Sequence, residues 1–317
     1  MKIYTLGNGF VANHLSYTKI LDRLSADQKR IHYILKKYKP DVIVNCIGYC
    51  GIKNIDDCEI EKEETVIANT IIPTLLAIEC EKLGIRLVHI GSGCIYSGES
   101  NNFHYVQGDG SPMPDTIKTY SLGDPNYEPF WGKAFAHAMS MVLPSKKIED
   151  GWKEVDPANP QSYYSNTKAA TDLVISSMPC STILRIRMPI SDQDTPRNLI
   201  NKLRNYKQVI NIPNSVTFMD DLVRCIDWVI YHNLHGIYHV TNPQPLTAAR
   251  IMNEFKKYVP EHDFDYITEQ QLDQLTTAKR SNCILNSDKL TLTGFQMTNS
   301  DEALDNCMKN YIKNLRK

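Results

Sequence analysis

The segment Tyr164-Ser-Asn-Thr-Lys168 places a phenol and an ammonium group four residues apart. On a helix, side chains with this spacing lie on the same face. A free tyrosine has a pKa of about 10, and a nearby ammonium group stabilises the phenolate and lowers that value. Tyr164 is therefore a candidate proton donor to a carbonyl, with Lys168 as its electrostatic partner and as a ligand of a cofactor ribose. The alternative is the start of an ordinary amphipathic helix.

A second group of polar side chains, Gly91-Ser92-Gly93-Cys94-Ile-Tyr, follows the strand-like segment Arg86–Ile90. In open α/β sheets, active residues lie beyond the carboxyl ends of the strands. Ser92 is thus placed to hydrogen-bond the same carbonyl, and Cys94 puts a thiol beside it. The alternatives are a turn hydroxyl for Ser92 and a packed thiol for Cys94.

A glycine-rich turn, Gly7-Asn-Gly9-Phe-Val-Ala12, stands between the first strand-like run and the segment after it. Glycines in this GxGxxA pattern permit a tight turn and let the backbone approach a pyrophosphate. A structural turn is the alternative, but the position on the first strand of an alternating pattern favours a dinucleotide site. Asp22 stands where an acidic residue for the ribose is expected, yet Arg23 follows it directly. An arginine there would pair with a 2′-phosphate, which favours NADPH over NADH, with a solvated surface arginine as the alternative.

Alternating apolar runs and helical patterns surround these candidates. Apolar or β-rich runs predict strands at Lys2–Leu6, Asp41–Cys46, Arg86–Ile90, Ser181–Arg187 and Gly236–Val240. Helical spacing predicts helices at Phe10–Ser16, Glu64–Leu83 (ended by Gly84), Tyr164–Ser176, Val223–His232, Leu246–Tyr258 and Asn299–Leu315. Strands separated by helices of this length predict an α/β fold with a Rossmann-type, doubly wound parallel sheet.

The pattern also suggests how the chain is divided. We expect residues 1–190 to form an NADP-binding Rossmann core, and residues 191–317 to form mainly a smaller C-terminal substrate lobe, with some segments returning to the core. The stretch Glu99–Asn159 is crowded with Pro, Gly, Asn and Tyr and holds one helix-like piece, Trp131–Val142. It is an insertion that could cover the substrate site, build a partner surface or alter substrate choice.

Composition excludes several classes of protein. The chain has 317 residues, of which 42% are hydrophobic and 22% charged, with a formal net charge of −1. Neither sign dominates, so we expect no nucleic-acid or membrane surface. No apolar run approaches the roughly 20 residues of a membrane span, and a strand-like pattern from Met1 onward leaves no room for a signal peptide.

Nine cysteines, an odd number scattered over the chain, favour a reducing compartment, and we expect a cytoplasmic protein. Cys46, Cys50 and Cys58 are the closest group, but their spacing is not a CxxC pair and no histidine lies nearby. Packed thiols are therefore preferred to a zinc site, and no metal is expected.

Taken together, these motifs resemble the extended short-chain dehydrogenase/reductases. More narrowly, the chain is similar to the plant-type nucleotide-rhamnose synthase epimerase/reductases and to dTDP-4-dehydrorhamnose reductase. The resemblance covers nearly the whole chain, and its most specific part runs from RIRMPIS to NIPNS, residues 185–215. Other similar segments are DVIVNCIG, NIDDCE, GSGCIY, YYSNTK, PRNLINK, HVTNP and RSN.

The resemblance implies a role for individual positions. Ser92, Tyr164 and Lys168 match the reductase triad, and Cys94 and Lys202 match the acid/base pair assigned to epimerisation. The implied substrate-binding residues are Ser92, Cys94, Met188, Asn198, Lys202 and Arg280. The implied cofactor-binding residues are Gly7, Asn8, Gly9, Phe10, Val11, Arg23, Cys46, Gly48, Asn69, Tyr164, Lys168 and Arg187.

The function implied is that of a bifunctional 3,5-epimerase/4-keto-reductase, which converts a UDP- or dTDP-linked 4-keto-6-deoxyglucose to nucleotide-L-rhamnose with NADPH. The keto group acidifies the hydrogens on C3 and C5, so an acid and a base can invert both centres through an enolate before C4 is reduced. Two other functions stay open: a reductase without epimerase activity, and a non-catalytic Rossmann subunit that regulates a partner. A GDP-sugar epimerase/reductase is a further relative, which the GSGCIY segment fits but the RMPIS and NIPNS segments do not. The alternative for Lys202 is a solvated lysine beside Arg204 and Lys207. The resemblance also implies a homodimer, paired through the helices Glu64–Leu83 and Tyr164–Ser176.

Overall fold

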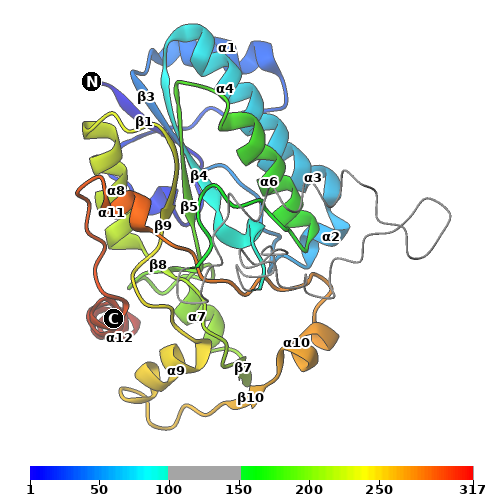
Figure 1. The fold of residues 1–317 in the computed structure, drawn as a ribbon, viewed down its shortest axis with the longest axis vertical. Coiled ribbons are helices and arrows are strands. Elements are labelled where there is room, and N and C mark those ends of the chain that lie inside the picture. Colours follow the sequence, from blue (N-terminus) through cyan, green and yellow to red (C-terminus); the bar gives the residue numbers. More distant parts are fainter. Residues whose placement is uncertain (99–150, 317) are drawn as a thin grey trace, which may run out of the picture. The chain divides into compact units, whose positions relative to one another are not determined.

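The computed structural model describes residues 1–98 and 151–316 of the chain (Figure 1). The predicted helix Trp131–Val142 and most of the expected insertion lie outside these residues. The chain forms two compact units, one made of Met1–Ser97 with Lys153–Lys317 and the other of Gly98–Trp152. Every helix and strand discussed below belongs to the first unit.

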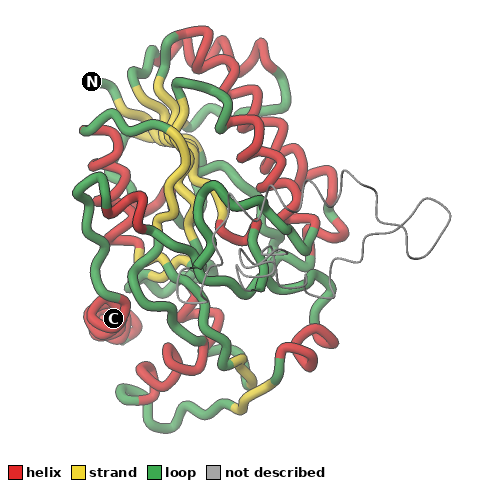
Figure 2. Tube along the Cα trace, viewed as in Figure 1, coloured by secondary structure: helices red, strands yellow, loops and turns green. Residues whose placement is uncertain are grey.

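A parallel sheet lies at the centre of this unit (Figures 1 and 2). Its order is β2-β1-β3-β4-β5-β9, and every neighbouring pair is parallel. The strands are β1 (Ile3–Leu6), β2 (Thr18–Ile20), β3 (Val42–Asn45), β4 (Arg86–Ser92), β5 (Ser181–Ile186) and β9 (Gly236–Val240). All strands predicted from the apolar runs are confirmed, because only such runs can be buried on both faces of a parallel sheet.

Helices cover both faces of the sheet, so the doubly wound, Rossmann-type prediction is confirmed. On one face, α1 (Gln28–Tyr38), α4 (Ile72–Leu83) and α6 (Tyr163–Ile175) pack with Ile43 and Leu87. On the other, α8 (Met219–Tyr231) and α11 (Asp288–Thr291) pack with Val44 and Val88. Adjacent strand residues thus serve opposite faces, as the period of two requires.

The predicted helix Phe10–Ser16 is wrong. A 3₁₀ turn, Ala12–His14, stands in its place, and the chain then enters β2. Tyr4 of β1 lies beside Thr18 of β2 in the sheet. This connection is too short for a helical crossover, which normally takes about a dozen residues or more.

The predicted helix Glu64–Leu83 is confirmed, with an irregularity in the middle. It consists of α3 (Lys62–Val66), a π-helical turn at Ile67–Ile71 and α4, ended by Gly84 at φ 66°. π-Turns often occur at functional sites because they re-aim side chains. Asn69 lies in this turn and is fully buried.

A second group of elements packs around its own hydrophobic core. It contains the parallel pairs β6 (Pro189–Ile190) with β8 (Thr217–Phe218) and β7 (Gln208–Ile210) with β10 (Asp265–Ile267). Its helices are α7 (Leu199–Leu203), α9 (Ala248–Lys256), α10 (Glu269–Leu275) and α12 (Ser300–Leu315). Residues from α7, α9 and α12 form this core. Of the intervening elements, β9 belongs to the central sheet and α8 packs against it (Figure 1).

Glu79 of α4 fastens this helix to α1. Its carboxylate, only 2% exposed, accepts hydrogen bonds from Gln28 (2.6 Å) and His32 (2.7 Å) of α1 and from Lys82 (2.8 Å). Burial alone would raise the pKa of Glu79, but these donors outweigh it and lower the pKa to about 2. The ionised carboxylate is therefore the form that the fold stabilises.

We expect Glu79→Gln to lower the free energy of unfolding at pH 7 by about 1–3 kcal/mol, because charge-assisted hydrogen bonds are lost. A folded pKa below the ordinary value means that this stability is present above about pH 4.5 and is lost as the pH falls toward 2. Urea titrations at several pH values should show the difference between wild type and variant shrinking in that window. Glu81→Gln, at an exposed position two residues on, is the control and should change little. A pH-independent difference would contradict the ionised clamp.

Candidate active site

Helix α6 presents Tyr164 and Lys168 in the arrangement that their spacing predicted. The helix begins with a capping box, in which Ser162 and Ser165 satisfy each other's backbone N–H groups. Tyr164 therefore stands in the first turn, and Lys168 follows one turn later at 5% exposure. Tyr164 interacts with Ser92 at the end of β4, and the Lys168 ammonium group lies near Gly48, in the loop after β3.

Ser92 and Cys94 lie at the end of β4. The Ser92 hydroxyl accepts a hydrogen bond from the backbone N–H of Cys94 at 3.1 Å. Burial and the neighbouring thiols of Cys94 and Cys50 raise the pKa of Tyr164, and a hydrogen bond with Ser92 opposes the rise. The spacing of Tyr164 and Lys168 predicted a lowered pKa for Tyr164, and this prediction is wrong because desolvation of the phenol dominates. A protonated phenol is nevertheless the form that a proton donor requires.

The loop after β3 approaches the Lys168 side chain closely at Gly48. A side chain at Gly48 would put its Cβ 3.5 Å from the Lys168 Nζ and 3.3 Å from the Asn69 Oδ1. The Asn69 amide in turn accepts from the backbone N–H of Tyr49 (2.7 Å) and donates to its carbonyl (2.8 Å). Burial lowers the pKa of Lys168, while the carboxylate of Asp172 opposes this. Asn69 thus positions the loop rather than standing free to bind a ligand.

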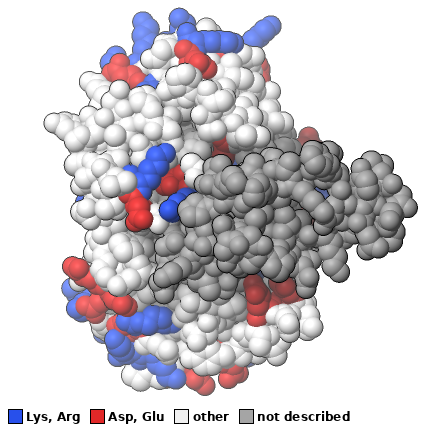
Figure 3. Space-filling model, in the orientation of Figure 1, with Lys and Arg blue, Asp and Glu red and all other residues white. Residues whose placement is uncertain are grey.

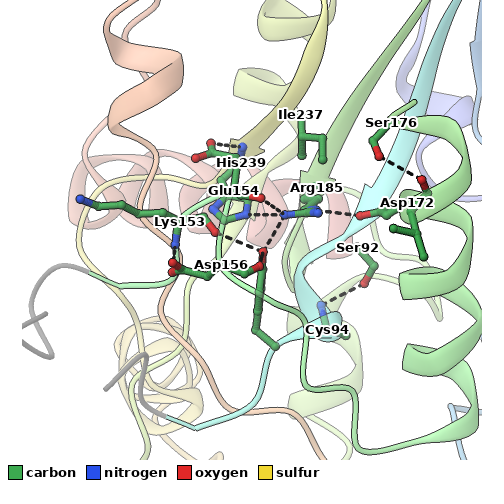
Figure 4. A network of polar contacts seen from close by, with 12 residues as sticks. Ser92, Cys94, Lys153, Glu154, Asp156, Asp172, Ser176, Arg185, Ile237 and His239 are labelled. Atoms are coloured by element: carbon green, nitrogen blue, oxygen red, sulfur yellow. Dashed lines mark hydrogen bonds and ion pairs between the residues drawn. The ribbon is translucent and has the colours of Figure 1, made fainter. Parts of the chain in front are cut away.

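A buried polar network connects α6 to β5 (Figure 4). Arg185 of β5 donates to Asp172 of α6 (2.7 Å), to the Tyr96 hydroxyl (2.7 Å) and to the Glu154 carbonyl (3.3 Å). Asp172 lies one turn after Lys168, so the ion pair fixes the part of α6 that carries the lysine. Arg185 and Asp172 are 5% and 3% exposed, and breaking a pair this buried would leave an uncompensated charge.

The glycine turn after β1 has the shape that a dinucleotide needs. Gly7 has φ 108°, and a Cβ there would lie 3.0 Å from the Cys46 carbonyl carbon, so only glycine fits. A Cβ at Gly9 would meet nothing within 4 Å, which leaves open space beside the turn. Phe10 and Val11 pack against the core and hold the turn in place. These residues fit a nicotinamide dinucleotide, with Lys168 close by for its ribose.

Two other predicted cofactor residues have different surroundings. Arg23 is exposed, shortly after β2, on the carboxyl side of the sheet. Its neighbour Asp22 is occupied by Lys37 (2.8 Å) and Tyr38 (2.7 Å) of α1. Burial raises the pKa of the Cys46 thiol to about 12, so it is a neutral packing group. In the described part of the chain, no group of three His, Cys, Asp or Glu side chains could hold a metal ion.

Arg187 contacts the Cys94 thiol. Predicted as a cofactor residue, it donates from one guanidinium nitrogen to Cys94 Sγ at 2.8 Å and from another to Asn214 at 2.7 Å. It follows β5 directly and is 4% exposed. Met188, the next residue, has φ 42°, a strained value for a side chain of this kind and one often found at functional sites.

Lys202 joins this group from α7. Burial lowers the pKa of Lys202, as do the charges of Arg197 and Arg280, whereas the thiols of Cys50 and Cys94 oppose the change. The ammonium group is therefore half-buried beside both thiols, unlike the solvated lysine that was the alternative. Lys202 and Cys94, far apart in sequence, are therefore close enough in the fold to interact electrostatically.

Asn198 has a structural task instead of the substrate contact that the resemblance implied. Fully buried, it caps α7 and accepts from the backbone N–H of Ser191 at 3.2 Å. Its amide donates to the carbonyls of Ser191 (2.7 Å) and Gln193 (2.8 Å). With its hydrogen-bonding groups engaged, Asn198 orients α7 and hence Lys202.

A cavity of about 560 Å³ opens from Cys94 into the second group of elements. Cys94, Arg187, Met188 and Arg280 line it, as predicted substrate or cofactor residues. Other lining residues were not predicted: Asn54, Asp56, Asn205, Tyr206, Gln208, Asn214, Leu272, Leu275 and Asn282. Its size suits a small-molecule ligand.

Arg280 is fixed at the cavity wall by Asp56. Two guanidinium nitrogens donate to the two carboxylate oxygens at 2.8 Å each, and the backbone N–H of Ala278 donates to the same group. Burial opposes ionisation of Asp56, but these hydrogen bonds outweigh it and lower the pKa. Asp56 belongs to the NIDDCE segment, so this motif contributes the carboxylate that fixes Arg280 at the cavity wall.

Cys50 is a further residue near this site that the sequence analysis did not assign to it. Arg197 donates to its thiol at 3.3 Å and to the Gly51 carbonyl at 2.6 Å. The Cys50 thiol also influences the pKa values of Tyr164, Lys168 and Lys202. The sequence signal for Cys50 is its position between Gly48 and Gly51, in the loop that follows a buried strand.

The molecular surface and the helices give further information. On the face shown in Figure 3, acidic and basic side chains are interspersed among the described residues. In the described part of the chain, no helix is long and apolar enough to cross a membrane.

Comparison with known proteins places this geometry in a family. The sequence model of the RmlD substrate binding domain matches residues 12–122. A bifunctional dTDP-4-dehydrorhamnose 3,5-epimerase/dTDP-4-dehydrorhamnose reductase of Arabidopsis thaliana is 30% identical over 288 residues, which is 90% of this chain and 81% of that protein. A trifunctional UDP-glucose 4,6-dehydratase/UDP-4-keto-6-deoxy-D-glucose 3,5-epimerase/UDP-4-keto-L-rhamnose-reductase of the same plant is 28% identical over 83% of this chain, which spans only 34% of it.

Solved structures agree on the fold. The crystal structure of the UDP-rhamnose synthase from Acanthamoeba polyphaga mimivirus matches with a TM-score of 0.77 and 23% identity, covering 97% of this chain and 99% of that one. The dTDP-4-dehydrorhamnose reductase of Bacillus anthracis, solved in complex with NADP, matches with a TM-score of 0.71 and 16% identity, over 96% and 97% of the two chains. The chain belongs to the RmlD family, whose members include dTDP-4-dehydrorhamnose reductases and plant nucleotide-rhamnose synthases.

Proposed function

We propose that this protein is a bifunctional 3,5-epimerase/4-keto-reductase that converts UDP- or dTDP-4-keto-6-deoxyglucose to the nucleotide-linked L-rhamnose. One observation carries the proposal. Cys94, at the end of β4 beside Ser92, accepts a hydrogen bond from Arg187 and is close enough to Tyr164 and Lys202 to interact electrostatically with both. A reductase without epimerase activity needs only Tyr164, Lys168 and Ser92, and a non-catalytic regulatory subunit needs none of these groups.

Epimerisation requires a base on one side of the sugar and an acid on the other. The lowered pKa of Lys202 brings its amine closer to neutrality, and the Arg187 guanidinium donates a hydrogen bond to the Cys94 thiol. One group would take the proton from C3 or C5, and the other would return a proton to the opposite face. Arg187 would also offset negative charge that develops on the sugar as the enolate forms.

Reduction follows at C4. NADPH, when bound, supplies the hydride, and the turn Gly7–Val11 with Gly48 and Lys168 would hold it at the carboxyl edge of the sheet. Tyr164 would donate its proton to the C4 oxygen, while Ser92 hydrogen-bonds the same oxygen. A half-buried phenol with a raised pKa suits this role, because it keeps the proton that it has to donate.

The nucleotide would bind in the cavity beyond Cys94. Arg280, fixed by Asp56, would face the diphosphate, and Met188 would contact the sugar end. We regard the elements around α7, α9 and α10 as the substrate lobe, built mainly from residues 191–317.

The experiment that tests this proposal incubates the purified protein with UDP-4-keto-6-deoxyglucose or its dTDP counterpart and NADPH, and identifies the product by NMR. The expected result is nucleotide-L-rhamnose, with one NADPH oxidised per sugar. A product reduced at C4 without inversion at C3 and C5 would leave a simple reductase. Cofactor binding without any turnover would favour the regulatory subunit.

NADPH preference depends on Arg23. We expect Arg23→Ala to lower kcat/KM for NADPH about tenfold while kcat/KM for NADH changes little, because one charge-assisted contact to the 2′-phosphate is lost. Lys36→Ala, on the exposed last turn of α1, is the matched control. An equal loss with both cofactors would mean that Arg23 does not recognise the phosphate.

A homodimer paired through α4 and α6 is also part of the proposal. Ile71, Leu173 and Val174, near and on these helices, are 37%, 77% and 37% exposed, although each is apolar. Light scattering should give twice the mass of the chain, and a monomeric mass would reject the pairing. All nine cysteines are free thiols, which supports a reducing, cytoplasmic location.

A further inference from the structure

A continuous series of hydrogen bonds connects helix α10 to the Cys94 thiol. Asn282 donates to the carboxylate of Glu269, in the first turn of α10, at 2.7 Å. Asn214 donates to the Asn282 carbonyl oxygen at 3.0 Å. Arg187 donates to the Asn214 carbonyl oxygen at 2.7 Å and, from its other terminal nitrogen, to Cys94 Sγ at 2.8 Å. We call Glu269, Asn282 and Asn214 the relay.

All the hydrogen bonds of the relay run in the same donor-to-acceptor direction. Each asparagine donates through its amide nitrogen toward Glu269 and accepts through its oxygen from the Cys94 side. Reversing either amide would break both of its bonds. The carboxylate at one end and the guanidinium at the other polarise the amides in the same sense, which strengthens each bond.

Burial gives these contacts their weight. Asn214, Asn282 and Arg187 are 2%, 9% and 4% exposed. A buried amide or guanidinium that loses its partner is costly, so the three side chains hold one another in place. Asn214 is itself anchored by the backbone N–H of Cys283 at 3.1 Å. Glu269, by contrast, is exposed, and α10 contributes no buried residue.

Arg187 depends on these partners for its orientation. Its side chain is long, and its Nε has no hydrogen-bond partner among the described residues. Besides Asn214, the backbone carbonyl of Ser281 accepts from the guanidinium. Loss of the relay would therefore let the guanidinium move away from Cys94.

Several charged or titratable groups face the Cys94 thiol, from α6, α7, the end of β5 and the segment before α11. They are Tyr164, Lys168, Lys202, Arg187 and Cys283. Of these, among the described residues, Arg187 alone donates a hydrogen bond to the thiol. An arginine next to a cysteine is one of the surroundings in which reactive cysteines are found.

We propose that Glu269, Asn282 and Asn214 are positioning residues, which hold the Arg187 guanidinium against Cys94 and so keep this thiol able to exchange protons. The acid/base use of Cys94 rests on the proposed function, whereas the relay itself is a property of the folded protein. Because Leu272 and Leu275 of α10 line the same cavity as Cys94, the relay connects the α10 side of the cavity wall with Cys94.

The test measures how fast iodoacetamide alkylates Cys94 as a function of pH, by quantifying the peptide that contains Cys94 in the full-length protein. Asn282→Ala should raise the pH midpoint by about one unit, which means roughly tenfold slower alkylation below the midpoint. Glu269→Ala should shift it in the same direction by less. Asp273→Ala, another exposed carboxylate on α10, is the matched control and should leave the midpoint unchanged. Cys180, a half-buried thiol before β5, serves as an internal reference.

The outcomes separate this inference from the proposed function, because alkylation needs no turnover. An unmoved midpoint in both Asn282→Ala and Glu269→Ala, or an equal shift in Asp273→Ala, would overturn the relay. If Asn282→Ala fails to fold in a melting experiment, Glu269→Ala decides the question, since its side chain is exposed. A shifted midpoint in a protein that does not epimerise sugars would uphold the relay and reject the epimerase.

Discussion

Tyr164→Phe is expected to lower the rate of C4 reduction by about a hundredfold or more, with NADPH binding almost unchanged. The phenol is the group of the site that combines a retained proton with a place beside Ser92. Proton donation by a positioned side chain contributes about 10²–10⁴-fold to such steps. Phenylalanine keeps the ring and the packing but removes the proton. Single-turnover oxidation of bound NADPH, with a sugar that is already epimerised, measures this step alone.

Tyr163→Phe is the matched control for this prediction. Tyr163 precedes Tyr164 on α6, but its ring lies over the Lys62 ammonium group, 5.5 Å from the ring centre. Loss of its hydroxyl should leave the reduction rate within about twofold of wild type, a change of less than 0.5 kcal/mol. Equal losses in both variants would mean that Tyr164 serves the fold of α6 rather than the reaction.

Cys94→Ala is expected to abolish the exchange of the C3 and C5 hydrogens with solvent, a loss of at least about a hundredfold. Reduction of UDP-4-keto-L-rhamnose, which needs no epimerisation, should fall by much less. The thiol accepts a hydrogen bond from Arg187 at 2.8 Å and interacts electrostatically with Lys202. Alanine removes the proton carrier while the Ser92–Tyr164 end of the site stays intact.

Cys180→Ala controls for the loss of a thiol as such, since Cys180 lies before β5 and contacts Ser181. Hydrogen exchange at normal rates in Cys94→Ala would show that another group carries the proton. Cys50, held by Arg197 beside Lys202, is then the next residue to replace.

The sequence predicted the central sheet and the catalytic helix because both depend on local patterns. Apolar runs such as DVIVNC can be buried only in the middle of a parallel sheet, and the spacing of Tyr164 and Lys168 defines a helical face. The sequence wrongly predicted a helix after β1, because Phe10–Ser16 is apolar enough for a helix or for an irregular connection. Its outcome depends on how soon the chain must enter β2 beside β1.

The side chains around Cys94 depended on contacts between distant segments. Arg187 and Asn198 were assigned from the resemblance, yet one binds the Cys94 thiol and the other caps α7. Asn214 and Asn282 are 68 residues apart in sequence and share a buried hydrogen bond. No periodicity or spacing in the sequence connects such positions.

The direction of the Tyr164 pKa also required the structure. Spacing alone suggested that Lys168 would lower it, but burial of the phenol exerts the larger effect. Lys168 itself is buried and interacts with Asp172, which is bound to Arg185. The electrostatic surroundings of Lys168, which neighbours Tyr164 on the helix, therefore depend on a polar network that spans α6 and β5 (Figure 4).

The most direct test of the bifunctional reaction is turnover of UDP-4-keto-6-deoxyglucose with NADPH in heavy water, with the product examined by NMR. An epimerase/reductase should yield UDP-L-rhamnose that carries deuterium at both C3 and C5. Reduction at C4 without deuterium at either carbon would contradict the epimerase and leave Cys94 and Lys202 without their proposed roles.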